Sequence, residues 1–155
     1  MSTRHMQEDM TMNMKVLSSS KMIGYWAATI IVTIELIVGG VTDLIHGPEL
    51  LFVGDPVALV LAHLGYPVYL LTILGVWKLL GAIALLMPRF PRLKEWAYAG
   101  TFFVYVMAVA SWAASGGGLG DLIGPIIFAM LTLASWALRP PSRTLGIILP
   151  AMAHA

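Results

Sequence analysis

The sequence contains no cysteine and few charged residues, and each shortage excludes a group of functions. Without cysteine the chain cannot form disulfides, thiolate metal sites or iron–sulfur clusters. Charged residues make up only 11% of its 155 residues, against about 25% in soluble domains. A soluble bundle with so few charges could not cover its surface, so we expect lipid to cover it.

Several recognition motifs are also missing. The net charge of +1 is too small to indicate a nucleic-acid partner. The sequence has no phosphate-binding glycine loop after a strand and no nucleophile elbow. Outside the apolar runs, the acidic and histidine residues show no tight ligand spacing, so we predict no metal site among Asp43, His46, Glu49, Asp55, His63 and Asp121.

The most prominent feature is a set of four long apolar runs, at residues 22–41, 67–87, 95–114 and 121–138. At ~1.5 Å per residue a helix of this length spans about 30 Å, the thickness of a hydrocarbon core. We therefore predict an all-α integral membrane protein with four transmembrane helices in an up-down-up-down bundle. Residues 57–64 are apolar but too short to span, and we expect them to form a short interfacial helix.

The basic residues predict the orientation. Eight of the nine lysine and arginine residues flank the runs on one side of the membrane. The positive-inside rule then places both termini in the cytoplasm. We expect residues 1–20 to be a disordered cytoplasmic tail, 21–140 the transmembrane domain and 141–155 a short cytoplasmic tail. The first segment also offers Met12 and Met14 as alternative start positions.

Two charged residues lie inside the spans and need an explanation, because a charge at mid-membrane costs a few kcal/mol. From the helix rise, Glu35 lies about 20 Å and Lys78 about 14 Å from the ends of their helices that face the cytoplasm. A lysine side chain can bridge that difference in depth. Tyr105, at about 15 Å in the third span, belongs to an aromatic stripe and needs a hydrogen-bond partner.

We therefore expect Glu35, Lys78 and Tyr105 to form a buried polar cluster. Two roles remain open for it. The three side chains could satisfy one another and fix the helix register. They could also bind a quinone-like head group, a small solute or a proton.

Three stretches closely resemble the DoxX-like family of small bacterial membrane proteins. They are residues 63–67 (HLGYP), residues 74–81 (LGVWKLLG) and residues 88–100 (PRFPRLKEWAYAG), and a looser likeness extends over residues 22–140. The resemblance implies a multi-pass, four-helix protein of the bacterial inner membrane. One departure is that Trp112 follows Ala110-Ser111, where family members commonly have histidine.

The resemblance also frames the expected function. The family takes its name from a quinone-linked subunit of thiosulfate oxidation. We expect a non-catalytic integral membrane subunit or accessory protein in a redox or stress-response setting, in contact with lipid and with other membrane or redox proteins. One alternative is a quinone-interacting oxidoreductase subunit, in which Lys78 and Tyr105 bind a quinone carbonyl. The other is a proton or small-solute carrier that uses Glu35 and Lys78.

Overall fold

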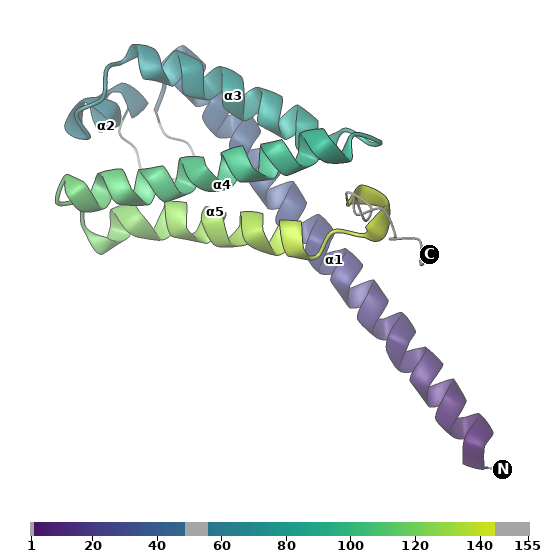
Figure 1. Cartoon of the computed structure of the whole chain (residues 1–155). Helices are drawn as coiled ribbons and strands as arrows, with labels where there is room; N and C mark the ends of the chain where they lie inside the picture. Colours follow the sequence, from purple (N-terminus) through teal and green to yellow (C-terminus); the bar gives the residue numbers. More distant parts are fainter. Residues whose placement is uncertain (1, 49–55, 145–155) are drawn as a thin grey trace, which may run out of the picture.

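The structure is a computed structural model that describes residues 2–48 and 56–144. Within these residues the chain forms five α-helices and one 3-10 helix, without a β-sheet. In chain order the elements are α1 (Ser2–Ile45), α2 (Val57–His63), α3 (Tyr69–Leu86), α4 (Pro91–Ala114), α5 (Leu119–Ala137) and the 3-10 helix η1 (Pro141–Arg143) (Figure 1).

Four helices are long and apolar enough to cross a membrane. They are the part of α1 from Ser18 to Ile45 and the whole of α3, α4 and α5. Large apolar side chains such as Ile30, Ile34 and Trp77 are exposed on the outside of the helices, where lipid would surround them. The predicted all-α, four-span membrane fold is confirmed, and α2 lies where a short helix was expected. The orientation in the membrane stays a prediction.

The first helix differs from the expectation at both ends. It already begins at Ser2, where a disordered tail was expected, and it continues past Val41 to Ile45. Residues 2–20 contain neither glycine nor proline. Once the apolar span has nucleated a helix, each added residue gains a hydrogen bond at little cost. The polar segment therefore extends the helix instead of ending it.

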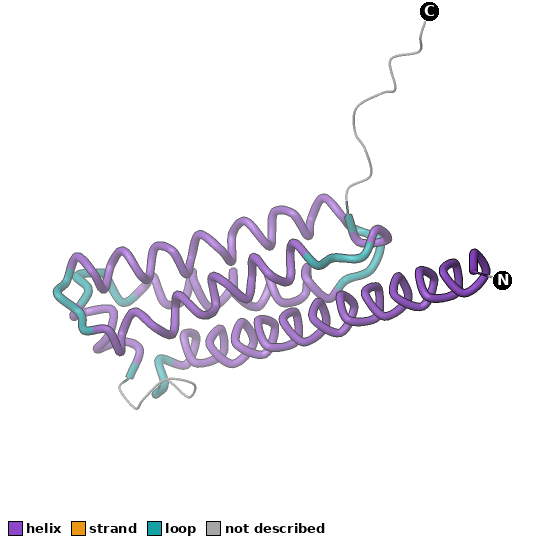
Figure 2. The backbone as a smooth tube through the Cα atoms, turned by 90° about the horizontal axis from the view of Figure 1, so that it is seen from below, coloured by secondary structure: helices purple, strands orange, loops and turns teal. Residues whose placement is uncertain are grey.

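The four spans form a ring. α1 packs against α3 and α5, and α4 packs against α5 and α3, while the short α2 lies against α3. Figure 2 shows the long helices side by side, with α1 extending beyond the bundle. We call the end with the α3–α4 turn and the C-terminus of α5 the basic end, and the opposite end the α2 end (Figure 1).

The helices approach closely where their facing residues are small. A Cβ atom built on Gly75 of α3 would lie only 2.7 Å from the backbone oxygen of Gly40 in α1. Glycine is used in this way in membrane helices to bring two backbones together. The main core contains apolar side chains from all four spans, namely Val32, Leu36, Ala82, Leu85, Tyr98, Tyr105, Phe128 and Ala129.

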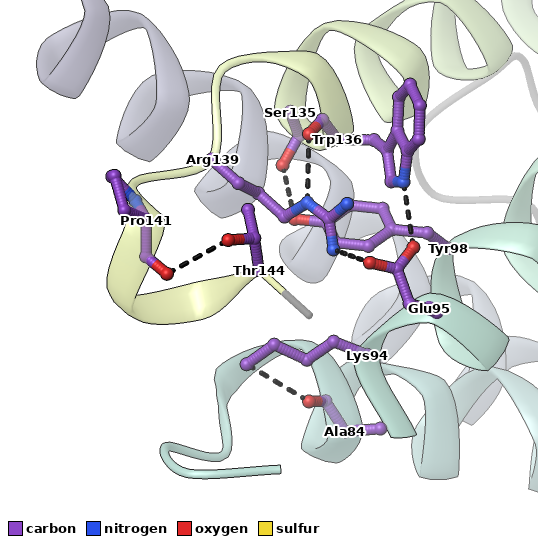
Figure 3. A network of polar contacts seen from close by, with 9 residues as sticks. All are labelled: Ala84, Lys94, Glu95, Tyr98, Ser135, Trp136, Arg139, Pro141 and Thr144. Atoms are coloured by element: carbon purple, nitrogen blue, oxygen red, sulfur yellow. Dashed lines mark hydrogen bonds and ion pairs between the residues drawn. The ribbon is translucent and has the colours of Figure 1, made fainter. Parts of the chain in front are cut away.

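A polar network ties three helices together at the basic end (Figure 3). The hydroxyl of Ser135 in α5 is hydrogen-bonded to Thr29 of α1 at 2.7 Å and to Tyr98 of α4 at 2.8 Å. Nearby, Arg139 donates to the carboxylate of Glu95 at 2.7 Å. These contacts fix the helices of the ring relative to one another.

Lys94 is almost completely buried at the basic end, and it closes the end of α3. Its ammonium donates to the backbone oxygens of Ala84, at 3.2 Å, and Leu85 (Figure 3). The last carbonyls of a helix have no amide partner within the helix. Pro88, which follows α3, has no N–H to offer them. A lysine from the next helix supplies the missing donors.

Candidate functional site: a charged cluster on an apolar cavity

The site begins with two carboxylates on one face of α1. Glu35 and Asp43 are eight residues apart, with Gly39 midway between them, and residues four apart in a helix lie above one another. Both carboxylates are buried, with 7% and 5% of the residue exposed. Glycine at the middle position leaves space on the helix surface between them.

Lys78 enters this space from α3. Its Nζ atom lies 3.0 Å from Oδ2 of Asp43 and 3.6 Å from Oε1 of Glu35. A Cβ atom at Gly39 would lie 2.9 Å from Glu35 Oε1 and 3.0 Å from Lys78 Nζ. The absence of a side chain at Gly39 therefore allows one ammonium to bridge two carboxylates.

Tyr105 completes the cluster from α4. Its hydroxyl donates a hydrogen bond to Oε2 of Glu35. The ring stacks on Phe128 of α5, with centroids 5.5 Å apart and planes inclined by 24°. Side chains from α1, α3 and α4 thus meet at one carboxylate, and an aromatic residue of α5 supports them.

The cluster lies on the wall of a large cavity. The cavity has a volume of about 730 Å³ and is partly open to the outside of the bundle. Glu35, Asp43, Lys78 and Tyr105 all line it, and most of its remaining wall is apolar. A concave, largely apolar space with a few convergent polar groups is the usual form of a small-molecule site.

The short helix α2 and the segment after it cover the α2 end of the cavity. Val57 and Leu61 of α2 line it and pack on Leu71 of α3. After α2, the hydroxyl of Tyr66 is hydrogen-bonded to Ser111 of α4 at 2.8 Å. The short helix that the sequence predicted is therefore part of the cavity wall.

The structure brings the three residues selected from the sequence together, with Glu35 in contact with both Lys78 and Tyr105. It adds Asp43, which the sequence analysis placed in the loop after the first span. Because α1 continues to Ile45, Asp43 falls on the helical face of Glu35. The regular spacing of Glu35, Gly39 and Asp43 was the signal that could have identified it.

The acidic and histidine residues near the α2 end do not converge. Among the described residues, no group of three histidine, aspartate or glutamate side chains is placed to hold a metal ion. Asp121 instead accepts a hydrogen bond from the backbone N–H of Gly118 at 2.8 Å and caps α5. Glu49 and Asp55 lie outside the described residues.

The geometry can do two things chemically. The carboxylates, the ammonium and the phenol can form hydrogen bonds and ionic contacts with a polar head group. The apolar walls can pack against a hydrophobic body. The ionisable groups also stay close enough to pass a proton among themselves. Neither use requires a nucleophile or a metal.

Comparison with known proteins supports the membrane assignment. The family model described as the DoxX-like family matches residues 27–135, which cover α3 and α4 completely, most of the spans in α1 and α5, and the residues of the cluster. No curated protein and no solved structure matches the chain.

Proposed function

Because the chain belongs to the DoxX-like family, we propose that it is a membrane subunit without a catalytic centre of its own, which binds a small lipid-soluble molecule in the cavity. The head group of this molecule contacts the cluster of Glu35, Asp43, Lys78 and Tyr105. Its apolar part lies against the walls between α3 and α4. The molecule enters from the bilayer, to which the bundle is exposed.

One observation carries this proposal. A partly open cavity of about 730 Å³ falls within the range of about 300–1,000 Å³ that is usual for small-molecule sites. The buried polar side chains of its wall, those of Glu35, Asp43 and Tyr105, all belong to the cluster. Buried charges whose only role is to fix helix register need no adjoining cavity, whereas a ligand site needs both.

Two more specific roles share this binding step. In a redox setting the molecule is a quinone, whose carbonyl oxygens accept hydrogen bonds from Lys78 and Tyr105. In a transport setting the molecule is a small solute that moves through the cavity past the charged side chains of Glu35 and Lys78. Binding is the event that both require, and it is therefore the event to test first.

The test is to fill the cavity. Ala108 lines the cavity on α4, whereas Ala110 is exposed on another face of the same helix. We expect Ala108→Phe to remove bound small molecules and Ala110→Phe to leave them in place. The measurement is mass spectrometry of an organic extract of the purified full-length protein, combined with melting temperatures in the presence of a decyl-substituted benzoquinone and of tetraphenylphosphonium.

The control variant matters because both substitutions add the same aromatic surface. Equal retention of small molecules by Ala108→Phe and Ala110→Phe would contradict the proposal. So would a melting temperature that neither probe changes in the wild-type protein.

A further inference from the structure

We propose that the molecule bound in the cavity carries a positive charge, as an amphipathic cation with an ammonium, phosphonium or guanidinium-like head and an apolar body. This inference rests on the proposed binding function and names its ligand class. It follows from the charges of the cavity wall, the positions of the acceptor atoms and the kind of side chain around them.

The charges on the wall are unequal. Three carboxylates line the cavity, from Glu35, Asp43 and Asp121, and one ammonium, from Lys78. The ammonium lies between Glu35 and Asp43, so that with both carboxylates ionised these three groups have one negative charge in excess. An uncompensated charge inside a membrane protein is costly, and uptake of a cation removes that cost.

Acceptor atoms in the cluster have capacity left. Oδ2 of Asp43 is buried and, among the described residues, receives no hydrogen bond of good geometry, although Lys78 Nζ lies 3.0 Å from it. The 3.6 Å between Lys78 Nζ and Glu35 Oε1 exceeds hydrogen-bond length. Both oxygens are buried on the cavity wall, so a ligand cation in the cavity would act on them at short range or after a small movement of Lys78.

A further acceptor lies on the cavity wall at the α2 end. Pro125 stands inside α5 and lines the cavity. Because proline has no N–H, the backbone oxygen of Asp121, four residues earlier, lacks its usual helical donor. This oxygen adds to the negative potential of the Asp121 side chain on the same wall.

Aromatic rings supply the rest of the environment. Phe103, Tyr105, Trp112 and Phe128 all line the cavity. The face of an aromatic ring attracts a cation, most strongly where water is excluded. Sites for lipophilic and quaternary cations combine such rings with carboxylates, and this wall has both.

The donors of the cluster are less suited to a neutral acceptor such as a quinone. The hydroxyl of Tyr105 is donated to Glu35, and Lys78 faces two carboxylates. A carbonyl oxygen would compete with ionised carboxylates for both donors. Hydrogen bonds to charged acceptors are roughly twice as strong as those to neutral ones, so the carbonyl loses this competition.

The experiment compares two ions of the same shape and opposite charge, tetraphenylphosphonium and tetraphenylborate, with a decyl-substituted benzoquinone as the neutral probe. Binding is measured by equilibrium dialysis on the full-length protein in zwitterionic nanodiscs. The signal from the Ala108→Phe protein is subtracted, since lipophilic ions also enter the bilayer. We expect saturable binding of the phosphonium and none of the borate.

Three variants test the assignment of the charges. Glu35→Gln and Asp43→Asn should each weaken phosphonium binding about tenfold or more, as expected when one partner of a buried charge interaction is removed. Lys78→Met should strengthen it, because it removes the competing cation. A neutral ligand that accepts a hydrogen bond from Lys78 should bind more weakly to the Lys78→Met protein. This variant therefore separates the two ligand classes even if a carboxylate variant fails to fold.

Each outcome has a distinct meaning. Saturable binding of the quinone or the borate, without the phosphonium, would overturn the positive charge of the ligand and leave the binding function intact. Failure of all three probes to bind in an Ala108→Phe-sensitive way would overturn both. Tighter phosphonium binding by Lys78→Met supports the inference.

Discussion

The contact between Gly75 and Gly40 makes a quantitative prediction about how the site is held. A Cβ atom at Gly75 would lie 2.7 Å from the backbone oxygen of Gly40 and 2.8 Å from Cγ of Leu44. Neither neighbour is the end of a flexible side chain that could turn away. Gly75→Ala therefore requires α1 and α3 to separate.

The size of the effect follows from two opposing terms. Overpacking at a close contact costs about 1–3 kcal/mol. The exchange of glycine for alanine in a helix returns up to about 1 kcal/mol of intrinsic helix stability. We expect Gly75→Ala to lower the free energy of unfolding by up to about 2 kcal/mol, and to be about 1–3 kcal/mol less stable than an alanine substitution that gains the helix stability without the overpacking cost. Because Lys78 lies one turn further along α3, the same movement should lengthen its contacts with the carboxylates.

The assay is reversible unfolding of the full-length protein in mixed micelles with increasing denaturing detergent. Gly100→Ala is the matched control, since a Cβ atom there would meet no atom within 4 Å. That variant should gain stability, by about 1 kcal/mol or less. The reasoning would be refuted if Gly75→Ala were as stable as Gly100→Ala.

Two further predictions concern the buried charges. In a double-mutant cycle, Glu35→Gln and Lys78→Met should show a coupling free energy above roughly 0.5 kcal/mol, and a smaller value would mean that the pair does not interact. Lys94→Met should lower the free energy of unfolding by about 1–3 kcal/mol, because it leaves buried carbonyls without donors. Arg92→Met, on the exposed side of the same helix, should change stability by about 0.5 kcal/mol or less, and equal losses for the two substitutions would refute the capping role of Lys94.

The fold was predictable from the sequence because it depends on simple quantities. Run length and the near absence of charge identify the spans, and a charge in the membrane stands out because it is costly. Glu35 and Lys78 were found for that reason, and Tyr105 because a buried hydroxyl requires a partner. Each of these inferences needs only the position of a residue along its own helix.

The remaining features depend on how helices meet, which periodicity does not determine. Asp43 was missed because the first helix was expected to end near Val41, and two more residues moved it from a loop to the face of Glu35. The cavity is lined by residues of all five helices, and no residue pattern along one helix encodes how the five come together. Residues 2–20 were expected to be disordered from their polarity, although a neighbouring stable helix can extend into polar sequence.

The arrangement of partners around α1 also has a consequence for biosynthesis. Glu35 enters the membrane with the first span, but Lys78 follows 43 residues later in the chain. At about 5–20 residues per second, this leaves Glu35 without its cation for about 2 to 9 seconds. Tyr105 and then Ser135, the partner of Thr29, are made later still. The polar side chains of the first span therefore obtain their last partner only when the fourth span has been made.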